Sequence, residues 1–108
     1  MSKYHNKKIE YDGIIFDSKK EMQYYIRLKD LESAGEIHDL ELQKEFTLQE
    51  KYRFKGKMIR EIKYRCDFYY TDSNNVVHVV DVKGLKTDVY KLKKKLFEYK
   101  YRIAIEEV

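Results

Sequence analysis

The chain contains no proline, only four glycines and no tract rich in glycine and serine. Without such tracts, internal repeats or low-complexity segments, the sequence offers no flexible linker between domains. Its 108 residues, of which 43% are hydrophobic and 15% aromatic, suffice for one domain with a buried core. We therefore expect residues 1–108 to form a single domain.

Cysteine and long apolar runs are equally scarce. Cys66 is the one cysteine, which excludes an intramolecular disulfide and suits a reducing compartment such as the cytoplasm. No run of about 18 apolar residues is present to cross a membrane. No apolar segment near Met1 resembles the core of a secretory signal. We expect a cytoplasmic protein without a membrane partner.

The net charge is only +4, because 23 lysines and arginines are nearly balanced by 19 aspartates and glutamates. A balance of this kind does not by itself indicate binding to nucleic acid. The distribution is more informative than the total. Basic residues are dense over Lys51–Arg65 and Lys83–Lys95, whereas acidic residues gather over Asp30–Glu50.

An Asp-Gly pair near the N-terminus predicts a β-hairpin. Asp12 and Gly13 suit a two-residue turn in which both central residues have positive φ. The flanking segments Lys8–Tyr11 and Ile14–Asp17 would form its two strands.

A helix should follow the hairpin at once. Ser18 and Glu21 have the spacing of a capping box, in which each side chain bonds a backbone amide of the first turn. The helix should run to about Ala34, where Gly35 supplies the left-handed residue that commonly ends a helix.

A two-residue alternation of apolar side chains begins after this helix and predicts strands. One or two strands of uncertain register should contain Ile37, Leu40, Leu42, Phe46 and Leu48. After a turn at Lys55–Lys57, one long strand should place five side chains on a single apolar face: Ile62, Tyr64, Cys66, Phe68 and Tyr70. A turn at Asp72–Asn75 then leads to a valine-rich strand over Val76–Val82.

The C-terminal part predicts a second helix and a closing strand. Gly84 interrupts the valine-rich strand, and Thr87 can cap a helix that runs to about Tyr99. Helical spacing assigns the core face to Val89, Leu92, Leu96 and Tyr99. The opposite, solvated face would hold Lys91, Lys94, Lys95 and Glu98. With a last strand over Arg102–Val108, the element order predicts an α/β fold, in which helices pack against a mixed sheet.

Glu21 is a charge in a position that should be apolar. It falls near the middle of the stripe that Tyr24, Tyr25, Leu28 and Leu31 form along the first helix. A carboxylate directed at a core is costly unless it is paired or coordinates a metal ion. Two interpretations are open: Glu21 belongs to the capping box alone, or it is also a ligand at the helix end.

Asp67, Asp81 and Lys83 form a second unusual set. In a strand, Asp81 and Lys83 project from the same face about 6.5–7 Å apart. An ion pair would explain these two alone, but Asp67 lies on the preceding strand, where hairpin pairing can set it beside Asp81. Adjacent carboxylates repel unless a cation lies between them, and their hard oxygens suit Mg²⁺ or Mn²⁺. The set predicts phosphodiester hydrolysis, in which the metal neutralises the phosphate and Lys83 orients or deprotonates a water.

A helix glutamate, an aspartate on a later strand, and Asp-x-Lys before a basic helix together resemble the PD-(D/E)XK (restriction-endonuclease-like) nuclease superfamily. Four segments are similar to short phage-encoded Holliday-junction-resolvase-like or recombination endonucleases: Phe16–Glu21, Leu42–Gln43, Tyr64–Phe68 and Val80–Gly84. The resemblance extends from about Lys8 to Val108. Cys66 stands where the name of the superfamily has proline, a position that varies widely among these enzymes.

This resemblance implies one nuclease domain over residues 1–108, with an αβββαβ core, dependence on Mg²⁺ (or Mn²⁺) and hydrolysis of DNA. Asp67 and Asp81, with Glu21, would bind the metal, and Lys83 would be the catalytic lysine. Gln43, at a position that recurs in similar nucleases, would contact nucleic acid. The substrate would be branched or recombination-intermediate DNA of a phage, in the host cytoplasm. Because a junction has two strands to cut, a homodimer is also implied.

Basic residues that follow the predicted site are candidates for binding DNA. Lysines of the second helix can lie on one exposed face against the phosphate backbone, and the capped start of that helix can hold a phosphate. We assign this contact to Lys86, Thr87, Lys91, Lys94 and Lys95. A merely solvated helix face, with Glu98 as counter-charge, would also explain the pattern.

The remaining reactive side chains suggest no second site. His5, His38 and His78 lack any common metal-ligand spacing and are interpreted as ordinary surface or sheet residues. Cys66 lies on the apolar face of a strand, so it should be buried and inert.

Two other functions stay open. A non-catalytic nucleic-acid-binding module of the same fold would bind DNA without metal-dependent cleavage. A small interaction protein, such as a phage assembly or inhibitor factor, would use the carboxylates only in ion pairs and bind neither metal nor DNA. The presence of all four charged residues at the predicted site favours the nuclease over the binding module.

Overall fold

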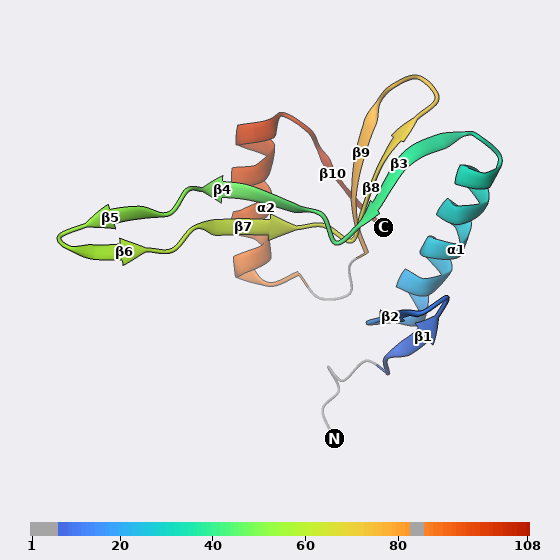
Figure 1. The fold of residues 1–108 in the computed structure, drawn as a ribbon, viewed down its shortest axis with the longest axis horizontal. Helices are drawn as coiled ribbons and strands as arrows, with labels where there is room; N and C mark the ends of the chain where they lie inside the picture. Colours follow the sequence, from blue (N-terminus) through green and yellow to red (C-terminus); the bar gives the residue numbers. More distant parts are fainter. Residues whose placement is uncertain (1–6, 83–85) are drawn as a thin grey trace.

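The computed structural model describes residues 7–82 and 86–108, which contain two helices and ten strands (Figure 1). In chain order these elements are β1 (Ile9–Tyr11), β2 (Ile14–Phe16), α1 (Lys19–Ser33), β3 (Ile37–Leu42), β4 (Glu45–Gln49), β5 (Tyr52–Phe54), β6 (Lys57–Ile59), β7 (Ile62–Arg65), β8 (Phe68–Asp72), β9 (Val77–Asp81), α2 (Asp88–Tyr101) and β10 (Ile105–Glu107). The α/β fold predicted from the sequence is confirmed. No helix among these residues is long and apolar enough to span a membrane.

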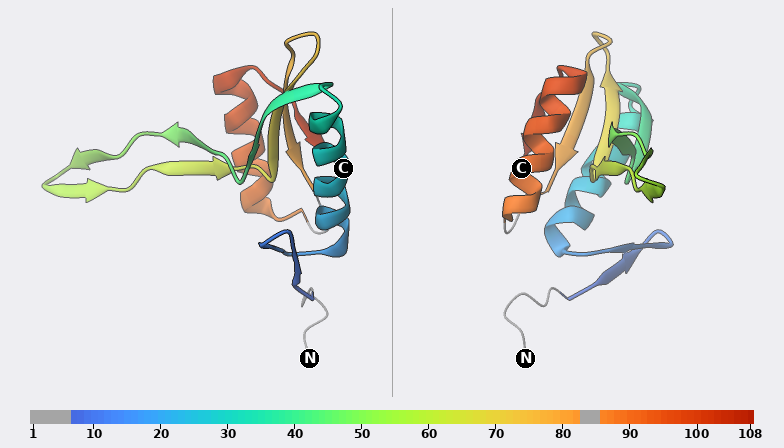
Figure 2. Two further views of the ribbon diagram at one scale, coloured as in Figure 1. Left: turned by 45° about the vertical axis from the view of Figure 1, so that its right-hand side comes forward. Right: turned by 90° about the vertical axis from the view of Figure 1, so that its left-hand side faces the viewer.

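Four strands form the central sheet, in the order β10-β9-β8-β3. β10 is parallel to β9, whereas the β9–β8 and β8–β3 pairs are antiparallel, so the sheet is mixed as predicted. Helix α1 packs on one face of this sheet and α2 on the other (Figure 2). These layers occur along the chain as α1, β3, β8, β9, α2 and β10, which is the predicted αβββαβ order.

The predicted N-terminal hairpin is present. β1 pairs antiparallel with β2, and the residues between them, Asp12 and Gly13, have φ values of 57° and 76°. The Tyr25 hydroxyl of α1 donates a hydrogen bond to Asp12 Oδ2 at 2.7 Å. This contact fastens the hairpin turn to the helix.

Helix α1 begins and ends where its capping residues predicted. Ser18 Oγ accepts a hydrogen bond from the Glu21 amide at 3.1 Å, which satisfies one of the unpaired donors of the first turn. The helix ends at Ser33, and Gly35 follows with a φ of 77°. Its inner face is buried against the sheet through Tyr25 and Leu28.

The core face of α2 differs from the prediction. Tyr90 and Phe97 are its buried residues, at 8% and 0% exposure, and they pack with Tyr64. The predicted stripe faces outward instead: Val89, Leu92, Leu96 and Tyr99 are between 37% and 72% exposed. Lys94 and Glu98, which were expected on the solvated face, are half-buried. The prediction was wrong because both stripes have helical spacing and the aromatic one buries more apolar area.

The strand predicted over residues 62–70 is two strands in the structure. β7 ends at Arg65 and β8 begins at Phe68. Between them the backbone changes partners: the Cys66 amide bonds the residue before β4, whereas the Asp67 amide bonds β9. The break therefore sets Asp67 at the junction of the central sheet and the β4–β7 sheet.

The apolar side chains change sides at this break. Tyr64 and Cys66 pack on the α2 side of the molecule, whereas Phe68 and Tyr70 pack on the α1 side. Ile62, the first member of the predicted face, is 37% exposed. Cys66 is fully buried, and this burial raises the pKa of its thiol to about 12, which agrees with an inert residue.

Residues 45–65 form a protruding β-structure, here called the arm (Figure 1). Its inner half pairs β4 with β7, and its outer half pairs β5 with β6 around the predicted turn at Lys55–Lys57. The inner half is anchored to α2, because Thr47 O accepts hydrogen bonds from Lys100 Nζ at 2.7 Å and from the Tyr101 hydroxyl at 2.8 Å. The outer half extends away from the body.

Candidate active site

Three predicted catalytic residues line one cleft, although they come from distant parts of the chain. Glu21 lies in the first turn of α1, Asp67 at the break between β7 and β8, and Asp81 at the end of β9. The cleft has a volume of about 910 Å³. Glu21 and Asp81 are only 6% and 4% exposed, so specific interactions must offset the loss of their hydration.

Glu21 serves the helix cap and also faces the cleft. Its Oε1 accepts a hydrogen bond from the Asp17 amide at 3.0 Å, while its own amide donates to Ser18 Oγ. The bond to Ser18 Oγ confirms Ser18 as the cap, but the second bond of the predicted capping box is shifted, because Glu21 accepts the amide of Asp17 and not that of Ser18. The same carboxylate lies close enough to Asp67 to raise the pKa of that residue, so the cap and the carboxylate cluster share one residue.

Asp67 is held by the backbone at the end of β9. Its Oδ2 accepts a hydrogen bond from the Val82 amide at 2.7 Å, and its Oδ1 accepts a longer one from Gln43 Nε2 at 3.4 Å. Burial raises the pKa of Asp67 to about 7; the Val82 amide opposes this shift, whereas the Glu21 and Asp81 carboxylates add to it. A proton or a cation beside Asp67 would offset the repulsion from the neighbouring carboxylates.

Asp81 is held by a residue that the sequence analysis assigned only to an apolar face. The Tyr64 hydroxyl donates a hydrogen bond to Asp81 Oδ2 at 2.6 Å, and both side chains are buried. Burial, and then the Asp81 carboxylate, raises the pKa of Tyr64 well above its ordinary value, so the hydroxyl remains a donor. Alternation predicted that Tyr64 is buried, but it carried no signal for this partner, because the contact joins two different sheets.

Of the other predicted site residues, Gln43 and Thr87 lie at the cluster or the cleft, whereas the position of Lys83 is not described. Lys83, the predicted catalytic lysine, lies outside the described residues. Gln43 contacts Asp67 and has a positive φ of 57°. Thr87 lines the cleft and caps α2, since its Oγ1 accepts a hydrogen bond from the Tyr90 amide at 3.1 Å.

The predicted lysine residues do not form one exposed face of α2. Lys86 and Lys94 both pair with Glu107, at 2.9 Å and 3.4 Å. A hydrogen bond from a neighbouring tyrosine hydroxyl, and then these two lysines, hold the pKa of Glu107 at about 2. Lys91 and Lys95 are exposed. Helical spacing alone could not show the pairing, because Glu107 reaches the helix from β10.

Cations from the arm also line the cleft. Arg60, Lys63 and Arg65 lie along it, with Lys20 and Lys93 contributed by the two helices. The basic density of this segment is visible in the sequence, but its connection with the site is not. In the fold, β7 leads directly into the break that carries Asp67, and this path brings the cations of the arm to the cleft. The lining also includes Asp17, Glu45 and Glu61, so the cations offset the carboxylates and do not make the cleft positive overall. Individual cations at its edge can still contact the phosphates of an anionic substrate.

The donor chemistry of the cleft fits a magnesium-like ion. Among residues 7–82 and 86–108, no three His, Cys, Asp or Glu side chains are grouped closely enough to form a complete metal site. Mg²⁺ needs fewer protein ligands, because it commonly binds through one or two carboxylates and retains several waters. Glu21 and Asp67 are adjacent, and Asp81 lines the same cleft. Their oxygens are therefore of the type that Mg²⁺ or Mn²⁺ binds, and the adjacent Glu21 and Asp67 would supply two of the ligands.

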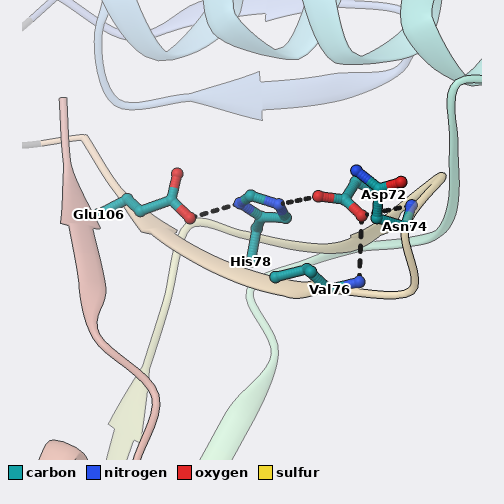
Figure 3. A network of polar contacts seen from close by, with 5 residues as sticks. All are labelled: Asp72, Asn74, Val76, His78 and Glu106. Atoms are coloured by element: carbon teal, nitrogen blue, oxygen red, sulfur yellow. Dashed lines mark hydrogen bonds and ion pairs between the residues drawn. The ribbon is translucent and has the colours of Figure 1, made fainter.

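A second polar cluster lies apart from the cleft lining (Figure 3). His78 Nε2 lies 2.8 Å from Asp72 Oδ2, and its Nδ1 contacts Glu106 Oε2. Burial acts to lower the pKa of His78, but the two carboxylates outweigh it and hold that pKa above its ordinary value. The imidazole thus joins β8, β9 and β10, a role that its isolated position in the sequence did not indicate.

The fold and the cleft define an α/β protein in which buried carboxylates and surrounding cations share one site. The chain belongs to the family described as "Protein of unknown function (DUF1064)", whose family model matches residues 1–106. No curated protein and no solved structure matches the chain.

Proposed function

We propose that this protein is a metal-dependent endonuclease that hydrolyses phosphodiester bonds in DNA. The observation that carries the proposal is the meeting of Glu21, Asp67 and Asp81 in a cleft that is also lined by cations. Carboxylates able to hold a divalent ion, beside cations able to hold phosphates, are the groups that this reaction uses. The resemblance to PD-(D/E)XK nucleases and the αβββαβ element order support the same reaction.

The described residues explain how the carboxylates would be positioned. The Val82 amide fixes one oxygen of Asp67, and the Tyr64 hydroxyl fixes one oxygen of Asp81. Partners of this kind orient metal ligands and limit their motion. Asp67, Asp81 and Glu21 would hold Mg²⁺ or Mn²⁺, which when bound would neutralise phosphate charge and lower the pKa of a water.

The chain also supplies groups for the substrate. Arg60, Lys63 and Arg65 would bind phosphates beside the scissile bond, since they line the cleft that contains the carboxylates. By the resemblance, Lys83 would orient or deprotonate the attacking water. Addition of that water across the P–O bond leaves one phosphate monoester and one free hydroxyl.

We further infer that the substrate is branched or recombination-intermediate DNA of a phage and that the enzyme acts as a homodimer. The substrate follows from the resemblance. The dimer follows because a four-way junction has two strands to cut, whereas residues 7–82 and 86–108 of each chain form one such cleft. Sedimentation with and without a four-way junction tests it. A strict monomer that nicks one strand per encounter would indicate a flap or nicking nuclease instead.

Cleavage assays test the proposed activity. The protein is incubated with labelled junction, flap and linear DNA. We expect it to cut at least one of these substrates in Mg²⁺ or Mn²⁺ and none of them in EDTA. Asp81→Asn should abolish cleavage but keep DNA affinity, because an amide cannot supply the ligand charge. Asp39→Asn is the matched control, since Asp39 is exposed and its φ of 59° also suits asparagine. Wild-type cleavage rates in Asp81→Asn would overturn the assignment.

One observation favours a non-catalytic nucleic-acid-binding module as the second candidate. Glu21, Asp67 and Asp81 each have a protein partner already. Glu21 accepts a hydrogen bond from a backbone amide, Asp67 from the Val82 amide, and Asp81 from the Tyr64 hydroxyl. Buried polar groups satisfied in this way do not require a metal ion. This candidate predicts metal-independent DNA binding, with no cleavage of any of the three substrates.

A further inference from the structure

The arm carries charge out of proportion to its length. Residues 45–65 contain three glutamates and seven basic residues: Lys51, Arg53, Lys55, Lys57, Arg60, Lys63 and Arg65. The resulting net charge of +4 equals that of the whole chain, so all other residues together are electrically neutral. Within the part of the chain that the structure describes, Lys63 is the one basic side chain of the arm in an ion pair, with Glu45 and Glu61. The arm therefore presents a concentrated positive charge to solvent.

The tip of the arm also exposes apolar side chains. Tyr52, Phe54 and Met58 are 46%, 58% and 51% exposed. They belong neither to the apolar core on the α1 side of the sheet nor to the one on the α2 side. Tyr52 pairs with Ile59 and Phe54 with Lys57, so the two rings share one face about 7 Å apart along the strand. These side chains do not stabilise the body. Aromatic rings beside lysines are the groups that bind unpaired bases and their phosphates.

The arm continues the wall of the candidate active site. Arg65 and Lys63 lie at its base, Arg60 lies farther along, and all three line the cleft that contains the carboxylates. From Arg65 to the turn at Gly56 the arm extends roughly 30 Å at the usual rise of a strand. Its base is fixed to α2 through Thr47, so its direction relative to the cleft is set by the fold.

We propose that the arm holds a DNA strand that enters the cleft, with its basic residues on phosphates and with Tyr52 and Phe54 stacked on unpaired bases. The choice of DNA as partner rests on the proposed function. The arm thereby gives the enzyme a preference for DNA in which unpaired nucleotides adjoin a duplex. A second copy of the arm fits this surface poorly, because two such hairpins side by side would repel through their like charges.

Binding of fluorescein-labelled DNA, measured by polarisation in EDTA, tests the role of the rings. The probes are a fork with unpaired arms and the corresponding blunt duplex. Tyr52→Ala combined with Phe54→Ala should weaken binding of the fork by at least about tenfold and that of the duplex by much less. Tyr99→Ala is the control, because Tyr99 is also exposed, at 72%, but lies on α2 outside the cleft lining. Unchanged affinity for the fork in the double variant would overturn the stacking.

The salt dependence of binding tests the charges. Lys57→Ala should reduce the slope of log K against log salt by about 0.7–0.9, the value for one phosphate contact. Lys29→Ala on α1, whose side chain is 45% exposed, should leave the slope unchanged. Equal slopes for wild type and Lys57→Ala would show that Lys57 contacts no phosphate, which contradicts its role in the proposal. Arm variants that lose self-association in sedimentation but keep DNA affinity would show that the arm binds a second copy, which refutes the proposal.

These measurements separate the arm from the nuclease activity. A wild-type protein that binds the fork through Tyr52 and Phe54 but never cuts would refute the nuclease and leave the DNA-binding arm in place. A protein that cuts DNA, and whose arm variants bind and cut as well as wild type, would refute the arm and leave the nuclease in place.

Discussion

The hydroxyl of Tyr64 offers a direct test of how the cleft is built. Tyr64→Phe removes one oxygen and keeps the ring, whose centroid lies 5.3 Å from that of Phe97. The lost hydrogen bond is buried, 2.6 Å long and accepted by the Asp81 carboxylate. Hydrogen bonds to charged groups contribute about 1.5–3 kcal/mol. We therefore expect the free energy of unfolding to fall by about 2 kcal/mol and Tm to fall by roughly 10 °C.

Urea unfolding of the metal-free protein, followed by circular dichroism, measures this change. Tyr99→Phe is the matched control, because an exposed tyrosine hydroxyl should alter the free energy of unfolding by less than about 0.5 kcal/mol. In parallel, Tyr64→Phe should slow DNA cleavage while DNA affinity is kept, since Asp81 loses the group that orients it. A loss of stability no larger than that of the control would refute the reasoning.

Three further predictions concern capping and titration. Ser18→Ala should lower the free energy of unfolding by about 1 kcal/mol in urea, and no change would mean that its hydrogen bond does not stabilise α1. His78 has a raised pKa, so its stabilising effect should be complete below about pH 6.5 and lost as pH rises through the folded-state pKa; His78→Gln should show no such loss in urea unfolding across that window. Asp67 has a pKa of about 7 against an ordinary value of about 3.9, so metal-free protein should lose stability as pH rises between these values. Asp67→Asn should abolish that loss together with cleavage, and a parent-like pH profile would contradict the assignment.

The parts of the fold that were predicted from the sequence have local causes. Asp12 and Gly13 adopt positive φ because of their own backbone preferences, and Ser18 caps α1 through an amide three residues away. Gly35 follows the helix for the same kind of reason. Such signals need no knowledge of distant residues, so the positions of the hairpin and of α1 were predicted closely.

The errors arose where distant residues decide the structure. The buried face of α2 depends on the aromatic residues Phe46 and Tyr64, which reach it from the arm. The predicted single strand breaks before Phe68 because its two halves pair with different partners. Neither effect is visible in the periodicity of one segment, since both helix faces and both half-strands keep a regular apolar spacing.

The candidate site divides in the same way. The closeness of Asp67 and Asp81 followed from chain order, because two strands joined by a short turn normally pair. The hydrogen bond from Tyr64 and the cations at Arg60 and Arg65 could not be predicted, because they depend on the path of the arm past the cleft. Chain order therefore placed Asp67 beside Asp81, whereas the groups that orient and surround them required the three-dimensional structure.

The separation of the arm into two halves makes its length adjustable. Phe46 and Tyr64 belong to the apolar core between the sheet and α2. No residue from 50 to 61 belongs to that core or to the core on the α1 side of the sheet. Paired residues could therefore be inserted or removed near the turn at Gly56 while both cores and the carboxylates stay in place. Steps of two residues on each strand would preserve which side chains share a face. The outer arm is thus a module whose reach can change during evolution or design without rebuilding the domain that supports it.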